Sequence, residues 1–194
     1  MKKGIIVLGI LGLVGLQIGC TALPGYDLLS SNSNGIKTVT SKSQFDEIAD
    51  NPSSYLGEEK KLAGAVVSID QTDEGYLILA EWLPYPKTQI EEGPQIGQTD
   101  RSRHFLIRFI GKREKEFYTT RGNIFLLEGT VEGTQKALVN IFGPRKDLLY
   151  VNARCVRIWE TGQDDSRSSQ LDNQYPPTRN RTLCADQPKK TPGL

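Results

Sequence analysis

The sequence contains few of the residues on which most catalytic and metal sites depend. Its 194 residues include one histidine, His104, and three cysteines. A catalytic triad or a Cys-His pair needs a histidine beside a nucleophile, and no partner set can be placed beside His104, which we expect at the solvent-exposed start of a strand. Zinc needs several nitrogen or sulfur ligands, and the sequence holds no glycine-rich phosphate loop or dinucleotide-binding motif. We therefore expect no enzymatic activity, no metal site and no cofactor.

An excess of charge of either sign is also missing. The 24 lysines and arginines face 23 aspartates and glutamates, and the formal net charge is +1. Nucleic-acid-binding domains usually carry a clear basic excess, so we expect no nucleic-acid partner. Beyond Cys20 the sequence contains no apolar run long enough to cross a bilayer as a helix.

The segment that ends at Cys20 predicts export and lipid attachment. Two lysines precede an uncharged apolar run over residues 4–16, and Gly19 stands directly before Cys20. As a helix this run spans only about 20 Å, short of the roughly 30 Å hydrocarbon core, so residues 1–19 are interpreted as a signal peptide. The Gly-Cys ending resembles a bacterial lipobox, in which the cysteine thiol is diacylated, the peptide is cut before it and the new amine is acylated. The alternatives are an ordinary cleaved signal and an uncleaved anchor.

Lipidation at Cys20 also predicts a location. Three acyl chains exceed the two signals needed for stable anchoring, so the expected partner is outer-membrane lipid, through the N-terminal acyl chains. In diderm bacteria a residue other than Asp after the lipidated cysteine favours transfer to the outer membrane, and Thr21 fits that rule. Residues 20–40 are rich in small polar residues and are interpreted as a flexible tether, with a packed N-terminal arm as the alternative.

The other two cysteines form an even pair in a compartment that permits disulfides. Cys155 lies in an expected strand, and Cys184 lies in a polar segment near the end of the sequence. Spacing alone does not prove a bond, so two interpretations stay open. Either Cys155 and Cys184 form a disulfide, or Cys155 is a buried free thiol.

One short helix is expected before the strands. Residues 41–50 carry a Ser cap and an apolar spacing of Phe45, Ile48 and Ala49 that is typical of a helix of two to three turns. Asn51 and Pro52 should end it. We expect this helix to close one end of the barrel that follows.

From residue 61 the pattern changes to short strands rich in β-branched, aromatic and large apolar residues. Turns are expected at residues 70–75, at Glu132-Gly133 and at Gly143-Pro144. Gly64 and Gly129 lie inside strands, where a missing side chain lets a sheet bend. The expected strands span residues 62–69, 76–82, 104–110, 124–132, 136–142 and 149–159.

The predicted fold is all-β: a small OB-like closed barrel of about five to six antiparallel strands with one or two short helices. The strands are apolar on both faces, which suits a closed barrel that is covered in part from outside. Residues 111–118 can form about two helical turns after the third strand, as in an oligonucleotide/oligosaccharide-binding (OB) fold. An immunoglobulin-like sandwich is the main alternative, but it has no place for this helix.

A basic run and a long connection are the candidate contact surfaces. The connection over residues 83–103 is long for a compact domain, so we interpret it as functional, as the mouth of a binding site. The near-neutral charge argues against nucleic acid, which leaves anionic lipid headgroups or lipopolysaccharide as ligands of the basic run, or an ordinary solvated face. The basic residues are Arg101, Arg103, Arg108, Lys112 and Arg113, and the aromatic residues able to stack on a ligand in an OB groove are Tyr76, Trp82, Phe105 and Phe109.

After Trp159 the sequence loses periodicity. Residues 161–194 are polar and are interpreted as a tail that does not fold alone. The expected organisation is therefore a signal peptide over 1–19, a tether over 20–40, a barrel domain over 41–160 and a tail over 161–194.

The central region carries an Asn-Pro-x-x-Tyr-x-Gly motif over residues 51–57, directly before an expected strand. With this motif the region resembles the Slp family of outer-membrane lipoproteins, the starvation-inducible lipoproteins of diderm bacteria. The most distinctive piece is the Asn-Pro-x-x-Tyr-x-Gly turn before a strand, and the likeness spans residues 41–159. The matching residues are Phe45 to Ile48, Asn51 to Gly57, Leu62 to Gly64, Pro84, Arg103 to Phe105, Phe117-Tyr118, Gly122, Gly129 and Ile158-Trp159. The resemblance implies an outer-membrane location and a stress-associated role without enzymatic chemistry.

Two functional hypotheses follow. The first is a non-enzymatic, lipid-anchored lipoprotein of the outer membrane that stabilises the envelope or binds an envelope protein or glycan. The second is a periplasmic ligand-binding β-barrel module for a glycan or a lipid.

Overall fold

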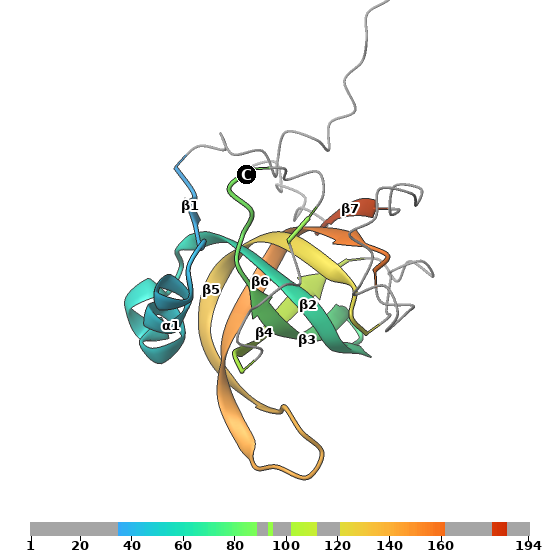
Figure 1. Cartoon of the computed structure of the whole chain (residues 1–194). Coiled ribbons are helices and arrows are strands. Elements are labelled where there is room, and N and C mark those ends of the chain that lie inside the picture. Colours follow the sequence, from blue (N-terminus) through green and yellow to red (C-terminus); the bar gives the residue numbers. More distant parts are fainter. Residues whose placement is uncertain (1–34, 89–92, 95–101, 112–120, 162–179, 186–194) are drawn as a thin grey trace, which may run out of the picture.

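The described part of the chain consists mainly of β-strands (Figure 1). The computed structural model describes residues 35–88, 93–94, 102–111, 121–161 and 180–185. The helical elements are α1 (Lys42–Asp50) and the 3-10 turn η1 (Pro52–Tyr55). The strands are β1 (Lys37–Thr38), β2 (Glu59–Gln71), β3 (Gly75–Leu83), β4 (His104–Ile110), β5 (Ile124–Leu138), β6 (Arg145–Trp159) and β7 (Asn180–Cys184).

Five of these strands close into a barrel. They are hydrogen-bonded in the order β2-β3-β4-β6-β5, and β5 pairs back onto β2. The predicted small all-β barrel is therefore confirmed, and its order is that of a Greek-key OB barrel. One detail of the prediction is wrong, because β4 and β6 pair in parallel, from Phe105↔Leu149 to Phe109↔Ala153. The reason is arithmetic: a ring with an odd number of strands must contain at least one parallel pair.

Glycines allow the long strands to coil around this small barrel. Gly64 lies in β2, where a Cβ atom would stand 2.6 Å from the Glu81 carbonyl oxygen and 2.7 Å from the Phe125 ring. Gly129 lies in β5, where a Cβ atom would stand 2.6 Å from the Asn152 carbonyl oxygen. A side chain at either position would push neighbouring strands apart, as expected for glycines inside bent strands.

The structure corrects one predicted turn. Glu132-Gly133 does not separate two strands, because β5 runs through it to Leu138 and stays paired with β6. Gly133 has a φ of +108° and lies at a register shift, so its conformational freedom produces a bulge in place of a turn. The turn between β5 and β6 comes later, where the Gly143 N–H donates to the Asn140 carbonyl oxygen at 2.9 Å.

Helix α1 closes one end of the barrel, as the sequence predicts. The Ser41 side chain accepts from the Gln44 backbone N–H, and the Gln44 side chain accepts from the Ser41 N–H, so a capping box fixes the start of the helix. Phe45 is fully buried and stacks on Trp82 at 5.3 Å between ring centroids. Its ring also meets Phe105 edge-on at 5.7 Å, so the helix is joined to the barrel interior by an aromatic cluster.

Both flanks of the barrel contain more structure than the sequence predicts. Residues 37–38, which belong to the predicted tether, form β1 parallel to β2, and Val39 is buried in the core. Residues 180–184, which belong to the predicted tail, form β7 antiparallel to β6. The tether and tail predictions are therefore wrong in these parts, because pairing with a sheet edge supplies contacts that the local polarity does not reveal. The predicted signal peptide, the rest of the tether and the predicted helix at 112–118 lie outside the described residues.

Candidate functional site

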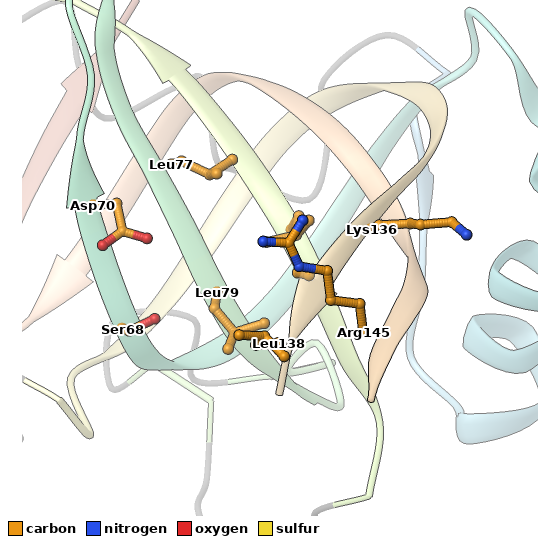
Figure 2. Close-up of a pocket in the computed structure, with 9 residues that line it drawn as sticks. Ser68, Asp70, Leu77, Leu79, Lys136, Leu138 and Arg145 are labelled. Carbon is orange, nitrogen blue, oxygen red and sulfur yellow. The ribbon is translucent and has the colours of Figure 1, made fainter. Parts of the chain in front are cut away.

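A groove of about 270 Å³ lies on the outside of the barrel, over β3 and β4 (Figure 2). One wall comes from β2 and the opposite wall from the β5–β6 hairpin, which continues beyond the part of β5 that pairs with β2. The groove is lined by Ser68, Asp70, Leu77, Leu79, Leu106, Lys136, Ala137, Leu138 and Arg145.

The floor of the groove is apolar. Leu79 and Leu106 are buried there together with Leu148, in a cluster separate from the barrel interior. Because successive side chains of a strand point to opposite faces, Tyr76 and Ile78 fill the interior while Leu77 and Leu79 face outward. This explains why the strand is apolar on both faces: the overhanging hairpin covers the outer leucines.

The rim of the groove is polar and charged. Ser68 and Asp70 stand on the β2 wall, and Lys136 and Arg145 stand on the hairpin wall. In Figure 2 the Arg145 guanidinium reaches over the groove, whereas the Lys136 ammonium points away from it. Among the described residues, none of these four side chains has a hydrogen bond or ion pair. The groove therefore combines an alkyl floor with one acidic wall and one basic wall whose polar groups are available to a ligand.

Two described members of the predicted basic run are separated and occupied. The Arg103 guanidinium lies 2.8 Å from an Asp46 oxygen of α1, whereas the Arg108 guanidinium pairs with Glu74 in the β2–β3 turn. Four residues of extended chain lie between the two arginines, which places their Cα atoms about 17 Å apart. Both arginine side chains remain 36% exposed, and their contact with an anionic surface stays a prediction. Arg101, Lys112 and Arg113 lie outside the described residues.

The predicted stacking aromatics do not reach the surface. Tyr76, Trp82, Phe105 and Phe109 are all buried in the barrel interior, so their role as ligand-stacking residues is wrong. Large aromatic rings in such a small barrel are needed to fill it, and inward-facing strand positions take them. No aromatic ring is among the residues that line the groove.

The described parts of the long connection 83–103 lie elsewhere on the barrel. Tyr85 and Trp159 are buried in a cluster on the outer face of β2 and β5, and a Cβ atom on Gly93 would stand 3.1 Å from the Trp159 ring. The Tyr85 N–H donates to the Val39 carbonyl oxygen at 3.2 Å. In its described parts, this connection contributes no residue to the groove, and its role as the mouth of a binding site stays a prediction.

Beside Tyr85 the barrel buries an ion pair. The Lys61 ammonium lies 3.5 Å from one oxygen of Glu128, and both side chains are 1% exposed. The Arg154 guanidinium lies 2.6 Å from the other oxygen and is 33% exposed. Burial, followed by the charge of Glu128, raises the pKa of Tyr85 to about 12, against a smaller opposing effect of Arg157. We interpret this cluster as structural, because it is covered and lies away from the groove.

His104 is the first residue of β4, at the strand start where the sequence places it, and its side chain is half-buried. Its pKa is lowered chiefly by burial, while contact with the Ser102 carbonyl oxygen raises it and the nearby charge of Lys146 lowers it. The described residues hold no group of three His, Cys, Asp or Glu side chains that is arranged to bind a metal.

The two strand cysteines are joined. Cys155 and Cys184 stand directly opposite one another in the β6–β7 register, with 4.0 Å between their Cα atoms, and form a disulfide. This bond fixes β7 to the edge of β6. Cys20 lies outside the described residues.

No protein-family model, curated protein or solved structure matches this chain. The Slp resemblance therefore stays a prediction. Within the described ranges, no helix combines the length and apolar character required to traverse a bilayer.

Sequence reasoning missed every residue of the groove. The usable signal was the pair Leu77 and Leu79, whose outward positions require a cover, together with the apolar pair Ile141-Phe142 beside an expected turn. Combining the two would have pointed to a hairpin folded over the β3–β4 face.

Proposed function

We propose that this protein is a non-enzymatic, lipid-anchored lipoprotein of the outer membrane, of Slp type and with an envelope or stress-associated role, whose barrel binds a ligand in the groove. The observation that carries the binding role is the position of the groove. OB barrels bind their ligands on the face of the second and third barrel strands, flanked by the loops after the first and fourth. In this chain those strands are β3 and β4, and the flanking elements are the β2–β3 and β5–β6 hairpins.

The lining favours a lipid over a glycan or a nucleic-acid strand. Sugars and bases are typically held by aromatic faces, whereas the floor here is built from Leu77, Leu79 and Leu106. An alkyl chain fits this floor, and an anionic head group fits Arg145 at the rim. At about 270 Å³ the groove is just below the roughly 300 Å³ of small ligand pockets, so it holds one segment of a chain.

The binding role is tested with a fluorescent fatty acid as the probe and a glycan panel as the alternative. Arg145→Glu places a negative charge beside the probe's carboxylate and should weaken probe binding by about ten-fold or more. Arg121→Glu is the matched control, because Arg121 is exposed and does not line the groove. Equal affinity of the wild-type chain, Arg145→Glu and Arg121→Glu for the probe would reject the proposal that the groove binds it. If the wild-type chain binds glycans of the panel but not the fatty acid, the proposed ligand is a glycan and not a lipid.

The anchoring role rests on the Gly-Cys ending at Cys20 and is tested separately. Palmitate labelling and separation of inner and outer membranes should find the wild-type chain labelled in the outer membrane. Cys20→Ser should abolish the label and release the chain from that fraction. An unlabelled wild-type chain would refute the lipid anchor and would leave the groove proposal untouched.

A further inference from the structure

The turn of the β5–β6 hairpin exposes two large apolar side chains. Ile141 is 81% exposed and Phe142 is 91% exposed, and Leu138 beside them is 45% exposed. Figure 1 shows this hairpin extending away from the barrel. We call Leu138, Ile141 and Phe142 the hairpin tip.

The local structure of the turn does not require these residues. Asn140 and Gly143 form it, because the Asn140 carbonyl accepts from the Gly143 N–H at 2.9 Å and the Asn140 side chain accepts from the Phe142 N–H at 3.0 Å. Turn corners usually carry Gly, Pro, Asn, Asp or Ser. Ile141 and Phe142 occupy the corner between the two turn-forming residues, and they belong to none of the apolar clusters formed by the described residues. The turn itself would form equally well with polar residues at these two positions.

Basic residues surround the hairpin tip. Lys136, Arg145 and Lys146 are exposed, and among the described residues none of their side chains has a hydrogen bond or ion pair. The one acidic side chain on the same stretch is Asp147, opposite Lys136 in the strand register. Exposed apolar side chains surrounded by a net positive charge match the chemistry of a bilayer with anionic headgroups. Apolar groups enter the interface of such a bilayer, and cationic groups stay at its surface.

We propose that the hairpin tip inserts into the interface of a bilayer that carries anionic lipid. The proposal does not depend on lipidation at Cys20. A protein partner or a second copy fits less well, since a stable interface buries about 800 Å² on each side and the hairpin tip offers three side chains on one narrow turn. A fluid interface needs no complementary surface and accepts an isolated apolar pair.

The test uses the full chain and places a fluorescent reporter at the hairpin tip. The native Trp82 and Trp159 are buried and give a constant background. Phe142→Trp is mixed with vesicles of phosphatidylcholine and phosphatidylglycerol that carry brominated acyl chains, which quench indole fluorescence on contact. The matched control is Ser54→Trp, an exposed position on η1.

On the anionic vesicles, the fluorescence of the Trp introduced by Phe142→Trp should be quenched and its emission should shift to shorter wavelength, and both effects should be smaller at high salt. The fluorescence of the Ser54→Trp control should change little. Adding Ile141→Ser to the Phe142→Trp reporter should lower the ratio of membrane-inserted to free protein by about ten-fold, because one large apolar side chain no longer enters the bilayer. Equal quenching of both reporters, or none at the hairpin tip, would overturn the proposal. Dimerisation abolished by Ile141→Ser with Phe142→Ser would also overturn it, in favour of a second copy. Membrane retention without quenching at the hairpin tip would overturn this inference alone and leave the lipid anchor standing.

Discussion

Removing the carboxylate of Glu128 should destabilise the barrel more than any other single change to a charged residue described above. Glu128→Gln keeps the size and polarity of the side chain but takes the negative charge away from the Lys61 ammonium, which is 1% exposed. It also removes the partner of Arg154 on the other oxygen. The chain must then keep the Lys61 charge in a place that water does not reach, and that cost appears as lost folding free energy.

The magnitude follows from the geometry. Two unit charges 3.5 Å apart interact by about 5 kcal/mol at an effective dielectric constant of about 20. Breaking a buried pair by removing one partner costs about 3–5 kcal/mol in general. Lys61→Met should cost at least about 1 kcal/mol less than Glu128→Gln, because Arg154 remains on Glu128 and keeps that carboxylate paired.

Urea denaturation followed by tryptophan fluorescence measures these differences. Trp82 and Trp159 are both buried, so unfolding changes their emission. Arg108→Met serves as the control, because it breaks an ion pair with Glu74 that is largely exposed and should cost under about 1 kcal/mol. A loss for Glu128→Gln no larger than that of Arg108→Met, or a larger loss for Lys61→Met, would refute the reasoning.

Three further predictions concern the core, the disulfide and pH. Phe45→Ala should lower the free energy of unfolding by about 3–5 kcal/mol in urea titrations, since it empties the fully buried contact between α1 and the barrel; a loss below about 1 kcal/mol would contradict this. Replacing Cys155 and Cys184 together by Ala should cost up to about 3.6 kcal/mol for their separation of 29 residues, measured in the same way, and unchanged stability would contradict the chain-entropy reasoning. Tyr85, with its pKa raised to about 12, should ionise well above the ordinary tyrosine pKa of about 10 in an ultraviolet titration. The folded chain holds this proton more tightly than the unfolded one, so stability should fall as pH rises from about 10 to about 12, and a Tyr85 that ionises near pH 10 would contradict this.

The sequence predicts those elements whose signals are local. The capping residues Ser41 and Gln44 fix the start of α1, and the spacing of Phe45 and Ile48 identifies its buried face. The bounds of β4 agree with the prediction, because an apolar run between polar residues is a sufficient signal for a buried strand. The barrel itself was predictable from strands that are apolar on both faces.

The predictions that the structure contradicts concern segments whose conformation depends on residues far away in the sequence. Gly133 permits either a turn or a bulge, and only the continued pairing of β5 with β6 selects the bulge. The polar segments that contain β1 and β7 gain their structure from the edges of β2 and β6, and β7 also from the disulfide. For the site, Asp70 and Arg145 come together across the groove although a long stretch of sequence separates them. No local pattern encodes that approach, which depends on the closure of the barrel and on the length of the hairpin.

The β5–β6 hairpin carries both the hairpin tip and one wall of the groove, and this links the two proposals. Ala137 and Leu148 pack the hairpin onto the outer leucine cluster, which holds the base of the hairpin against β3 and β4. Arg145 follows the turn directly and also lines the groove. A hairpin tip seated in an anionic interface therefore brings the basic wall of the groove to the level of the lipid headgroups. An alkyl ligand with an anionic head would then enter the groove from the bilayer side, with its head at Arg145 and its chain over Leu79 and Leu106.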